Sequence, residues 1–152
     1  MKVAKSATEK GGRVAKTNMF KSIVSGKGMV GSDAVNFIRA RAPASILKEA
    51  SSFLGVSEKR IFQMVVLPPT TAHRLIKNAK KLDAAITERV YRMGNTVKMA
   101  LEIFESNEKA TEWMRRPNQT LGGAAPLDLM DTEPGANSVR QVLNAIATGG
   151  VA

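Results

Sequence analysis

The side chains that most often carry catalysis are few in this sequence, and their spacing does not assemble a reactive site. His73 is the only histidine and there is no cysteine, so a catalytic triad or a Cys/His metal site has no set of residues to use. Glu102 with Glu105 and Glu108 with Glu112 have the spacing of neighbours on a solvated helix face. We therefore predict no catalytic residue, no metal site, no cofactor and no enzymatic activity.

Residues 26–31 read Gly-Lys-Gly-Met-Val-Gly, which is the spacing of a dinucleotide-binding loop. Such a loop works between a strand and a helix inside a β–α–β unit. No convincing strand precedes these residues, and the chain has no β–α–β pattern. A flexible linker is the better interpretation of this segment.

Basic side chains offer a different chemistry, the binding of a polyanion. The net charge is +10, and its distribution is uneven. Residues 1–31 carry seven Lys/Arg against one Glu, residues 32–104 carry twelve against six Asp/Glu, and residues 105–152 carry four against six. This asymmetry favours nucleic acid as the partner of the first two segments, whereas solubility alone is the simpler alternative.

The location of the protein is constrained by what the sequence lacks. It has no cysteine, as is common in a reducing cytosol, and its longest apolar runs, such as Met64-Val65-Val66-Leu67, are too short to span a bilayer. The basic N-terminal segment has no apolar core of the kind found in secretory signals. The prediction is a cytoplasmic protein with no membrane partner.

Apolar residues recur at helical spacing from Ser32 onward, and no window alternates at a strand period of two. This predicts an all-α fold, in which a helix-turn-helix-like bundle precedes a small helical domain. Caps and periods place the helices at about 33–40, from Pro43 to Leu54, after Ser57, after Thr70 or Thr71, from Asp83 to about 106, and at about 107–116, 126–131 and 135–148.

The expected division of the chain is a basic flexible extension at 1–31, a domain at 32–105 and a C-terminal domain at 106–152. The extension lacks a periodic apolar face, so we predict that it is largely disordered with at most a transient turn at Met19–Val24. In the long helix, Gly94 interrupts a heptad-like apolar stripe and suggests close helix approach. The stripe exceeds what one small neighbour must cover, and we predict a homodimer in which it packs partly within the chain and partly across a two-fold axis. It comprises Ile86, Val90, Met93, Val97, Ala100 and Phe104.

Residues 57–81 have the pattern of a helix-turn-helix, whose second helix places its first residues in the major groove. Val66 stands where such turns usually hold glycine, and Pro68 where a small capping residue is common, so we expect either a different turn geometry or weakened DNA binding. We expect Ile61, Phe62, Val65 and Val66 to face inward. The alternative is a helical core with a solvated basic rim. The predicted DNA-binding residues are Thr70, Thr71, His73, Arg74, Lys77, Lys80 and Lys81.

The segment from Trp113 to Leu129 is dense in turn residues, and Trp113 is expected to be a core anchor against Phe104, Ala110 and Leu121. Its pattern resembles the toxin-binding domain of Xre/MbcA/ParS-type antitoxins, the partners of RES-domain toxins. The positions that carry the resemblance are Phe104, Ala110, Trp113, Pro117-Asn118, Leu121-Gly122-Gly123, Pro126-Leu127, Leu129, Thr132, Gly135, Val139, Leu143, Ile146 and Gly149.

The resemblance implies an antitoxin that blocks the NAD-binding cleft of a RES toxin and represses its own operon by binding operator DNA, as a dimer within a toxin–antitoxin hetero-oligomer. The implied toxin-binding residues are Asn137, Arg140, Gln141 and Asn144 on the last helix and Gly149, Gly150, Val151 and Ala152 in a short uncapped tail. A stand-alone helix-turn-helix regulator and an interaction or localisation module remain alternatives.

Overall fold

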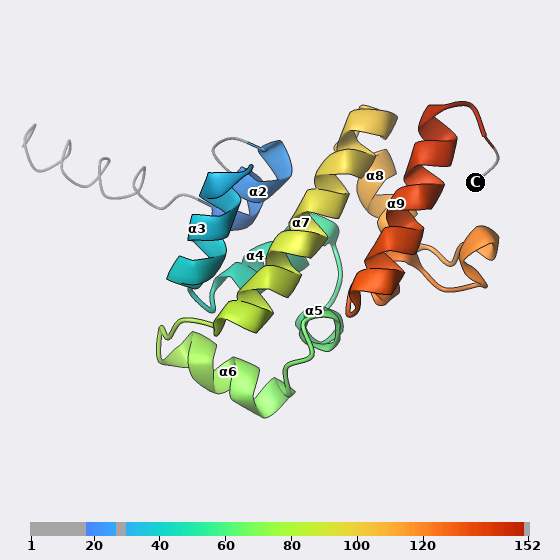
Figure 1. Ribbon diagram of the computed structural model, residues 1–152. Coiled ribbons are helices and arrows are strands. Elements are labelled where there is room, and N and C mark those ends of the chain that lie inside the picture. Colours follow the sequence, from blue (N-terminus) through green and yellow to red (C-terminus); the bar gives the residue numbers. More distant parts are fainter. Residues whose placement is uncertain (1–17, 27–29, 151–152) are drawn as a thin grey trace, which may run out of the picture.

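The computed structural model describes residues 18–26 and 30–150, and within them the chain is helical with no strand (Figure 1). This confirms the all-α prediction. The elements are α2 (Met19–Ser25), α3 (Ser32–Ala40), α4 (Ile46–Leu54), α5 (Glu58–Met64), α6 (Pro69–Lys77), α7 (Ala84–Phe104), α8 (Asn107–Arg115), the 3-10 turns η1 (Gln119–Leu121) and η2 (Pro126–Leu129), and α9 (Glu133–Ala147). No helix in these described ranges is long and apolar enough to cross a bilayer.

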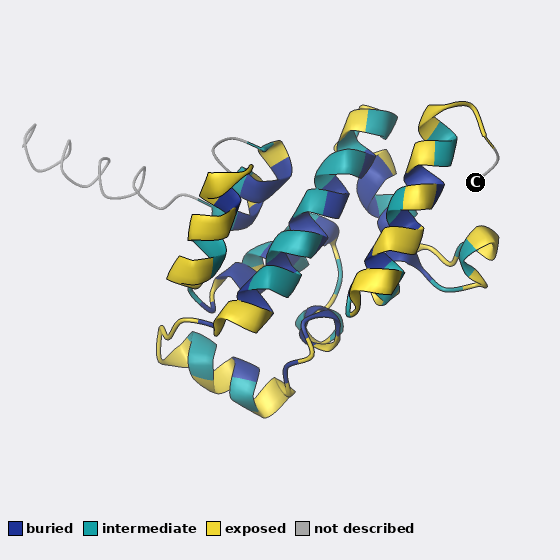
Figure 2. Cartoon of the chain, in the orientation of Figure 1, coloured by how far each residue is buried: buried dark blue, intermediate teal, exposed yellow. Residues whose placement is uncertain are grey.

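The 21-residue helix α7 is the axis of the molecule, and α2, α3, α8 and α9 pack around it (Figure 1). It begins where predicted, because the Asp83 side chain accepts a hydrogen bond of 2.8 Å from the backbone N–H of Ile86. Its apolar stripe is buried inside this one chain from Ile86 at 8% exposure to Ala100 at 0% (Figure 2). The expectation that a second copy covers this stripe is wrong for Ile86 to Ala100, because neighbouring helices already exclude water there, while Phe104 at its end is partly exposed.

The N-terminal segment differs from its prediction. Helix α2 is ordered, and its Phe20 and Ile23 are 0% and 1% exposed in the core shared with α7. Gly94 allows this contact, since a Cβ there would lie 2.6 Å from the Ile23 Cγ2 atom. The predicted close approach at Gly94 is confirmed, whereas the disorder predicted for 1–31 is wrong for residues 18–26. Residues 1–17 and 27–29, including part of the glycine motif, lie outside the described residues.

Helix α4 begins at Ile46, three residues later than expected, because Pro43 forms an isolated antiparallel bridge with Lys81. The predicted cap of α5 is confirmed, with Ser57 accepting a hydrogen bond from the N–H of Arg60. The predicted threonine cap of α6 is wrong. Pro68 occupies the N-cap position without a side-chain bond, and Pro69 opens the helix, where a missing N–H costs little.

A single apolar core extends from Phe20 to Leu143, so the two predicted domains are not packed separately. Arginines reinforce the contact between them. Arg115 of α8 donates to the carbonyl of Leu54 at the end of α4 (2.8 Å), and Arg92 of α7 donates to the carbonyl of Met130 (3.3 Å). A guanidinium that bonds a helix-end carbonyl satisfies an acceptor that the helix itself leaves open.

Candidate binding surfaces

The turn between α5 and α6 decides how α6 is presented. The N–H of Leu67 donates to the Phe62 carbonyl (2.9 Å) and the N–H of Val66 to the Gln63 carbonyl (3.2 Å), which is the Schellman pattern at a helix end. Val66 occupies the left-handed position with φ 57°, where glycine is usual. The expected change of turn geometry is therefore wrong, and so is the inward orientation of Val66, which is 57% exposed.

Helix α6 presents most of the residues predicted to bind DNA on one accessible side. Ala72 is fully buried and fixes the helix on the core, while Thr70, His73, Arg74 and Lys77 are exposed and Thr71 is half-buried. The His73 ring stands edge-on to Phe62 of α5, with centroids 5.2 Å apart. The contact between the two helices thus orients His73, and Arg74 follows it on the exposed surface. Side chains of this kind can reach base edges and phosphates.

Lys80 and Lys81 lie beyond the end of α6, in the connection to α7. The N–H of Lys80 donates to the Leu75 carbonyl, and that of Ala79 donates to the Ile76 carbonyl, so α6 also ends in a Schellman pattern. Ala79, at φ 50°, takes the left-handed position and is exposed. Both lysines are exposed, and the Lys81 ammonium donates to the Ala40 carbonyl (3.2 Å).

Helix α9 buries one face and exposes the other, as predicted. Val139 and Leu143 are 0% exposed against the shared core, while Asn137, Gln141 and Asn144 are exposed. Arg140 differs, because its guanidinium is paired with Glu133 on the same helix. Glu133 also pairs with Arg92 of α7 over 3.2 Å. The three amide side chains are therefore the free polar groups of this predicted face, and Arg140 is held by a neighbour.

The end of α9 is capped, contrary to the expectation of an uncapped tail. The N–H of Gly149 donates to the Ile146 carbonyl (3.1 Å) and the N–H of Gly150 to the Ala145 carbonyl (2.6 Å). Gly149 has φ 82°, the left-handed conformation that a side chain disfavours. Gly149 and Gly150 thus belong to the helix cap, whereas Val151 and Ala152 lie outside the described residues.

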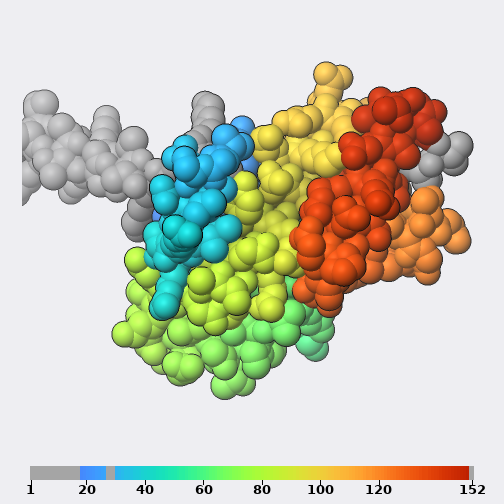
Figure 3. Space-filling model, viewed as in Figure 1, coloured from blue at the N-terminus to red at the C-terminus, as the bar shows by residue number. Residues whose placement is uncertain are grey.

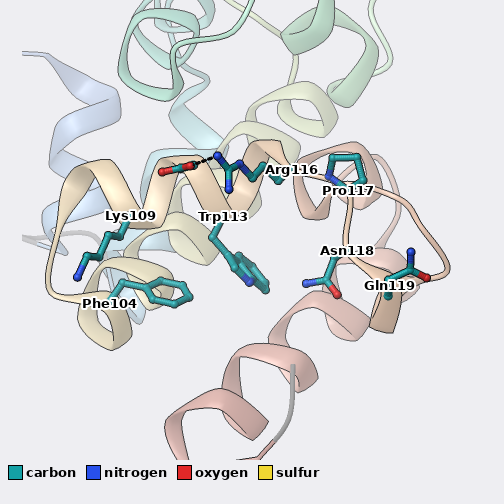
Figure 4. Close-up of a pocket in the computed structure, with 8 residues that line it drawn as sticks. Phe104, Lys109, Trp113, Arg116, Pro117, Asn118 and Gln119 are labelled. Atoms are coloured by element: carbon teal, nitrogen blue, oxygen red, sulfur yellow. Dashed lines mark ion pairs between the residues drawn. The ribbon is translucent and has the colours of Figure 1, made fainter.

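Several hollows border the η1 turn, including one of about 440 Å³ that reaches Pro134 and Gly135. Figure 4 shows the one of about 500 Å³, with Trp113 and Phe104 on one side and the turn at Pro117 on the other; it is lined by Phe104, Lys109, Glu112, Trp113, Arg116, Pro117, Asn118 and Gln119. The two rings are 5.8 Å apart. Another hollow, of about 340 Å³, lies between η1 and α9 and is lined by Thr120, Leu121, Ser138, Gln141, Val142 and Ala145.

Trp113 packs against Phe104 and the core as expected, and its partly exposed side also lines a surface hollow. Aromatic side chains with one exposed face are common in the centres of protein interfaces. Trp113, Thr120 and Ser138 were not predicted to take part in binding, although they line these hollows. The pattern of turn residues around Gly122 was visible, but only the packing of η1 beside α9 shows that a groove results.

Comparison with known families matches two parts of this chain. Residues 33–94 match the antitoxin Xre-like helix-turn-helix domain, and residues 99–149 match the antitoxin Xre/MbcA/ParS C-terminal toxin-binding domain. The chain belongs to the Xre/MbcA/ParS antitoxins. It is the antitoxin of a toxin–antitoxin system and carries a helix-turn-helix domain. The two matched segments meet inside α7, which this antitoxin keeps as one continuous helix.

Similar proteins carry antitoxin names. A Prs ADP-ribosylating antitoxin of Sphingobium sp. is 29% identical over 129 residues, covering 79% of this antitoxin and 81% of the relative. An antitoxin Xre of Photorhabdus laumondii is 25% identical over 108 residues, covering 70% and 73% of the two chains. An antitoxin Xre of Pseudomonas putida is 26% identical over 84 residues, covering 55% and 53%.

Proposed function

We propose that this antitoxin neutralises a RES-domain toxin that degrades NAD, and that it represses its own operon through α6. The observation that carries the first half is the match of residues 99–149 to a toxin-binding domain whose α9 points three amide side chains away from the core. The second half rests on the exposed residues of α6 within the matched helix-turn-helix domain. An NAD-consuming partner and an operator both imply a cytoplasmic location.

The chemistry of the toxin is supported by one relative. The name of the Sphingobium antitoxin refers to ADP-ribosylation, a reaction in which NAD donates its ADP-ribose group. Degradation of NAD and ADP-ribosylation both begin by breaking the bond between nicotinamide and ribose. A toxin of either kind must hold NAD in a cleft, so an antitoxin that fills this cleft inhibits by excluding the substrate.

The surface that we assign to the toxin combines the exposed face of α9 with the hollows beside η1. Asn137, Gln141 and Asn144 can donate and accept hydrogen bonds at the rim of a nucleotide cleft. Trp113 supplies a partly exposed aromatic surface nearby, which is a common centre of binding energy. Residues 149–152 follow α9 and carry no side chain larger than valine, so they suit a narrow cleft.

Neutralisation is tested by measuring NAD consumption by the toxin encoded beside this chain, with added full-length antitoxin and its variants. Removing residues 151–152 leaves the Gly149–Gly150 cap of α9 in place, whereas removing 149–152 also removes the cap. If these residues enter the cleft, both truncations restore toxin activity. If only the longer truncation restores toxin activity, inhibition depends on the Gly149–Gly150 cap of α9 and not on residues 151–152. Full inhibition by a 1–104 fragment would overturn the toxin-binding assignment.

The DNA half is tested by gel shift on the DNA upstream of the gene. We expect binding that weakens steeply with salt, and a loss of about 1–3 kcal/mol for Arg74→Ala if this side chain reads a base. Lys109→Gln is a matched control, since Lys109 is also an exposed cation but lies on α8. No upstream binding at low salt, with or without toxin, would eliminate the repressor role. Light scattering of the same samples tests the proposed homodimer, which has no support from the α7 stripe.

A further inference from the structure

Two connections of the helix-turn-helix domain are joined into one rigid corner. The N–H of Ala44 donates to the Lys80 carbonyl and the N–H of Leu82 to the Ala42 carbonyl, both over 2.8 Å. The Ala42 N–H also donates to the Thr87 hydroxyl of α7 (3.1 Å). Figure 3 shows the result, with the cyan end of α3 directly against the yellow-green chain that follows α6. The segment after α3 is thereby fixed beside the end of the DNA-reading helix.

Five exposed cations gather at this place, and we call them the basic corner: Arg39, Arg41, Lys77, Lys80 and Lys81. Inward residues alternate with them, since Ala42, Ala44 and Leu82 are each 1% exposed. Arg41 and Lys81 therefore stay at the surface while their neighbours enter the core. The Lys81 ammonium donates to the Ala40 carbonyl, which draws the two connections together at the surface as well.

The charge of the basic corner is not neutralised by the protein. Within residues 18–26 and 30–150, the ion pairs use Arg60, Arg92, Lys98, Arg116 and Arg140, and none uses a corner cation. Asp83 is the acidic residue in the two connections, and its carboxylate accepts the N–H of Ile86 as the cap of α7. Like charges held together without a counterion repel, so this arrangement favours binding of an anion.

The backbone of Arg41 is strained. Its φ of 63° and ψ of 130° lie outside the regions that side chains ordinarily adopt, although the residue is exposed and nothing buried requires an arginine there. Glycine would remove this strain. Strained residues are often retained where the side chain is used in binding. The strain and the unpaired charge thus point to the same side chain.

We propose that the basic corner binds the phosphate backbone of duplex DNA beside the groove that α6 enters. This inference rests on the DNA binding proposed above and assigns Arg39 and Arg41, outside the helix-turn-helix pair itself, to the same interface. A nine-residue helix is about 13 Å long, close to the width of about 12 Å of the major groove. When the first turn of α6 reads bases, its far end therefore reaches the phosphates that border the groove. Contacts of this kind set register and carry no sequence information.

The test is fluorescence anisotropy with the upstream duplex and an unrelated duplex over a range of salt concentrations. The full-length double variant Arg41→Gln/Lys81→Gln should weaken binding to both duplexes by the same factor, on the order of tenfold or more at low salt. The slope of log affinity against log salt should fall by about two, one for each lost phosphate contact. Lys109→Gln/Arg116→Gln, with the same change of charge on α8 and just after it, should leave both quantities unchanged.

Two further variants separate a phosphate contact from a structural role. Arg41→Gly should raise the melting temperature by about 2–4 °C while it weakens DNA binding, because it removes strain and charge together. Arg39→Gln/Lys80→Gln removes two charges whose side chains make no hydrogen bond among the described residues, so the corner stays intact and binding should still weaken. Arg41→Lys/Lys81→Arg, which keeps both charges, should retain the wild-type salt slope.

The outcomes distinguish the two levels of proposal. If the wild-type protein binds neither duplex, the DNA half of the proposed function and this inference both fall. If the wild type binds, Arg74→Ala weakens it and the corner variants bind normally, the inference alone is wrong. If the corner variants weaken binding to the upstream duplex only, the corner reads bases and does not bind phosphates. If they lose toxin capture without losing DNA binding, the corner belongs to the toxin interface. Either result overturns the inference.

Discussion

Arg60 of α5 and Asp128 of η2 form a bidentate ion pair across the boundary between the helix-turn-helix and toxin-binding segments. The Arg60 Nε and Nη2 atoms lie 2.9 and 3.1 Å from the two Asp128 oxygens. The same Nη2 also donates to the Arg115 carbonyl (3.2 Å). The first helix of the helix-turn-helix is thus attached to the surface that carries η1 and α9, so the two binding surfaces are held in a fixed relation.

This pair predicts a modest energetic coupling. In a double-mutant cycle of Arg60→Gln and Asp128→Asn, we expect a coupling of about 0.5–1 kcal/mol in the free energy of unfolding by urea, because both side chains are partly exposed. Arg60→Gln alone should cost more than Asp128→Asn, since it also loses the bond to the Arg115 carbonyl. Repeating the cycle at high salt should reduce the coupling. Additive single changes would show that the ion pair does not join the segments in solution.

The strained turn before α6 predicts a stabilising substitution. Val66→Gly should raise the free energy of unfolding by about 0.5–1 kcal/mol, because an exposed valine at φ 57° loses strain and gives up little packing. Ala79→Gly, in the equivalent position after α6, should have a smaller effect of the same sign. Gln63→Gly is the control, since Gln63 lies inside α5 and this change should destabilise it by about 1 kcal/mol. A destabilised Val66→Gly variant would contradict the assigned turn.

The contact between α2 and α7 predicts a steric effect at Gly94. Gly94→Ala places a methyl group 2.6 Å from the Ile23 Cγ2 atom and 3.5 Å from a Phe20 ring carbon, so α2 must shift. We expect a loss of about 1–3 kcal/mol, measured by thermal unfolding. Combining it with Ile23→Ala should cost less than the sum of the two single changes, because the methyl group then has room. Simple additivity would mean that α2 does not pack on Gly94.

The half-exposed Trp113 predicts separate effects on folding and binding. Trp113→Ala should cost about 2 kcal/mol in unfolding free energy, less than the loss for a fully buried tryptophan, because the side chain is already partly exposed. If its hollow contacts the toxin, the affinity for toxin should fall by more than this loss of stability explains. Trp113→Phe, which keeps an aromatic surface near Phe104, should retain most of the stability and most of the affinity for the toxin. Isothermal titration with the toxin on folded variants measures the difference, and equal binding by all three proteins would remove Trp113 from the interface.

Much of the local structure could be predicted because its causes are local. Ser57 and Asp83 were identified as caps from their residue types and positions, and both accept the expected backbone N–H in the structure. The helical period of α7 and the exposed amides of α9 likewise follow from spacing along a single helix. The errors at Thr70 and Val66 have one origin, since the pair Pro68-Pro69 and the hydrogen bond from the Leu67 N–H to the Phe62 carbonyl decide the turn more strongly than the preferences of single residues.

The helical fold, the starts of most helices, the excess of positive charge before residue 105 and the family pattern of the last third could all be predicted from the amino-acid order alone. Three further features depend on tertiary packing: Phe20 completes the core at Gly94, neighbouring helices cover the α7 stripe from Ile86 to Ala100, and the Lys81 ammonium reaches the Ala40 carbonyl. The reason is physical: a cap or a helical period is fixed by residues within about one turn of each other. A contact between residues about 40 or 70 positions apart depends on how every intervening helix packs.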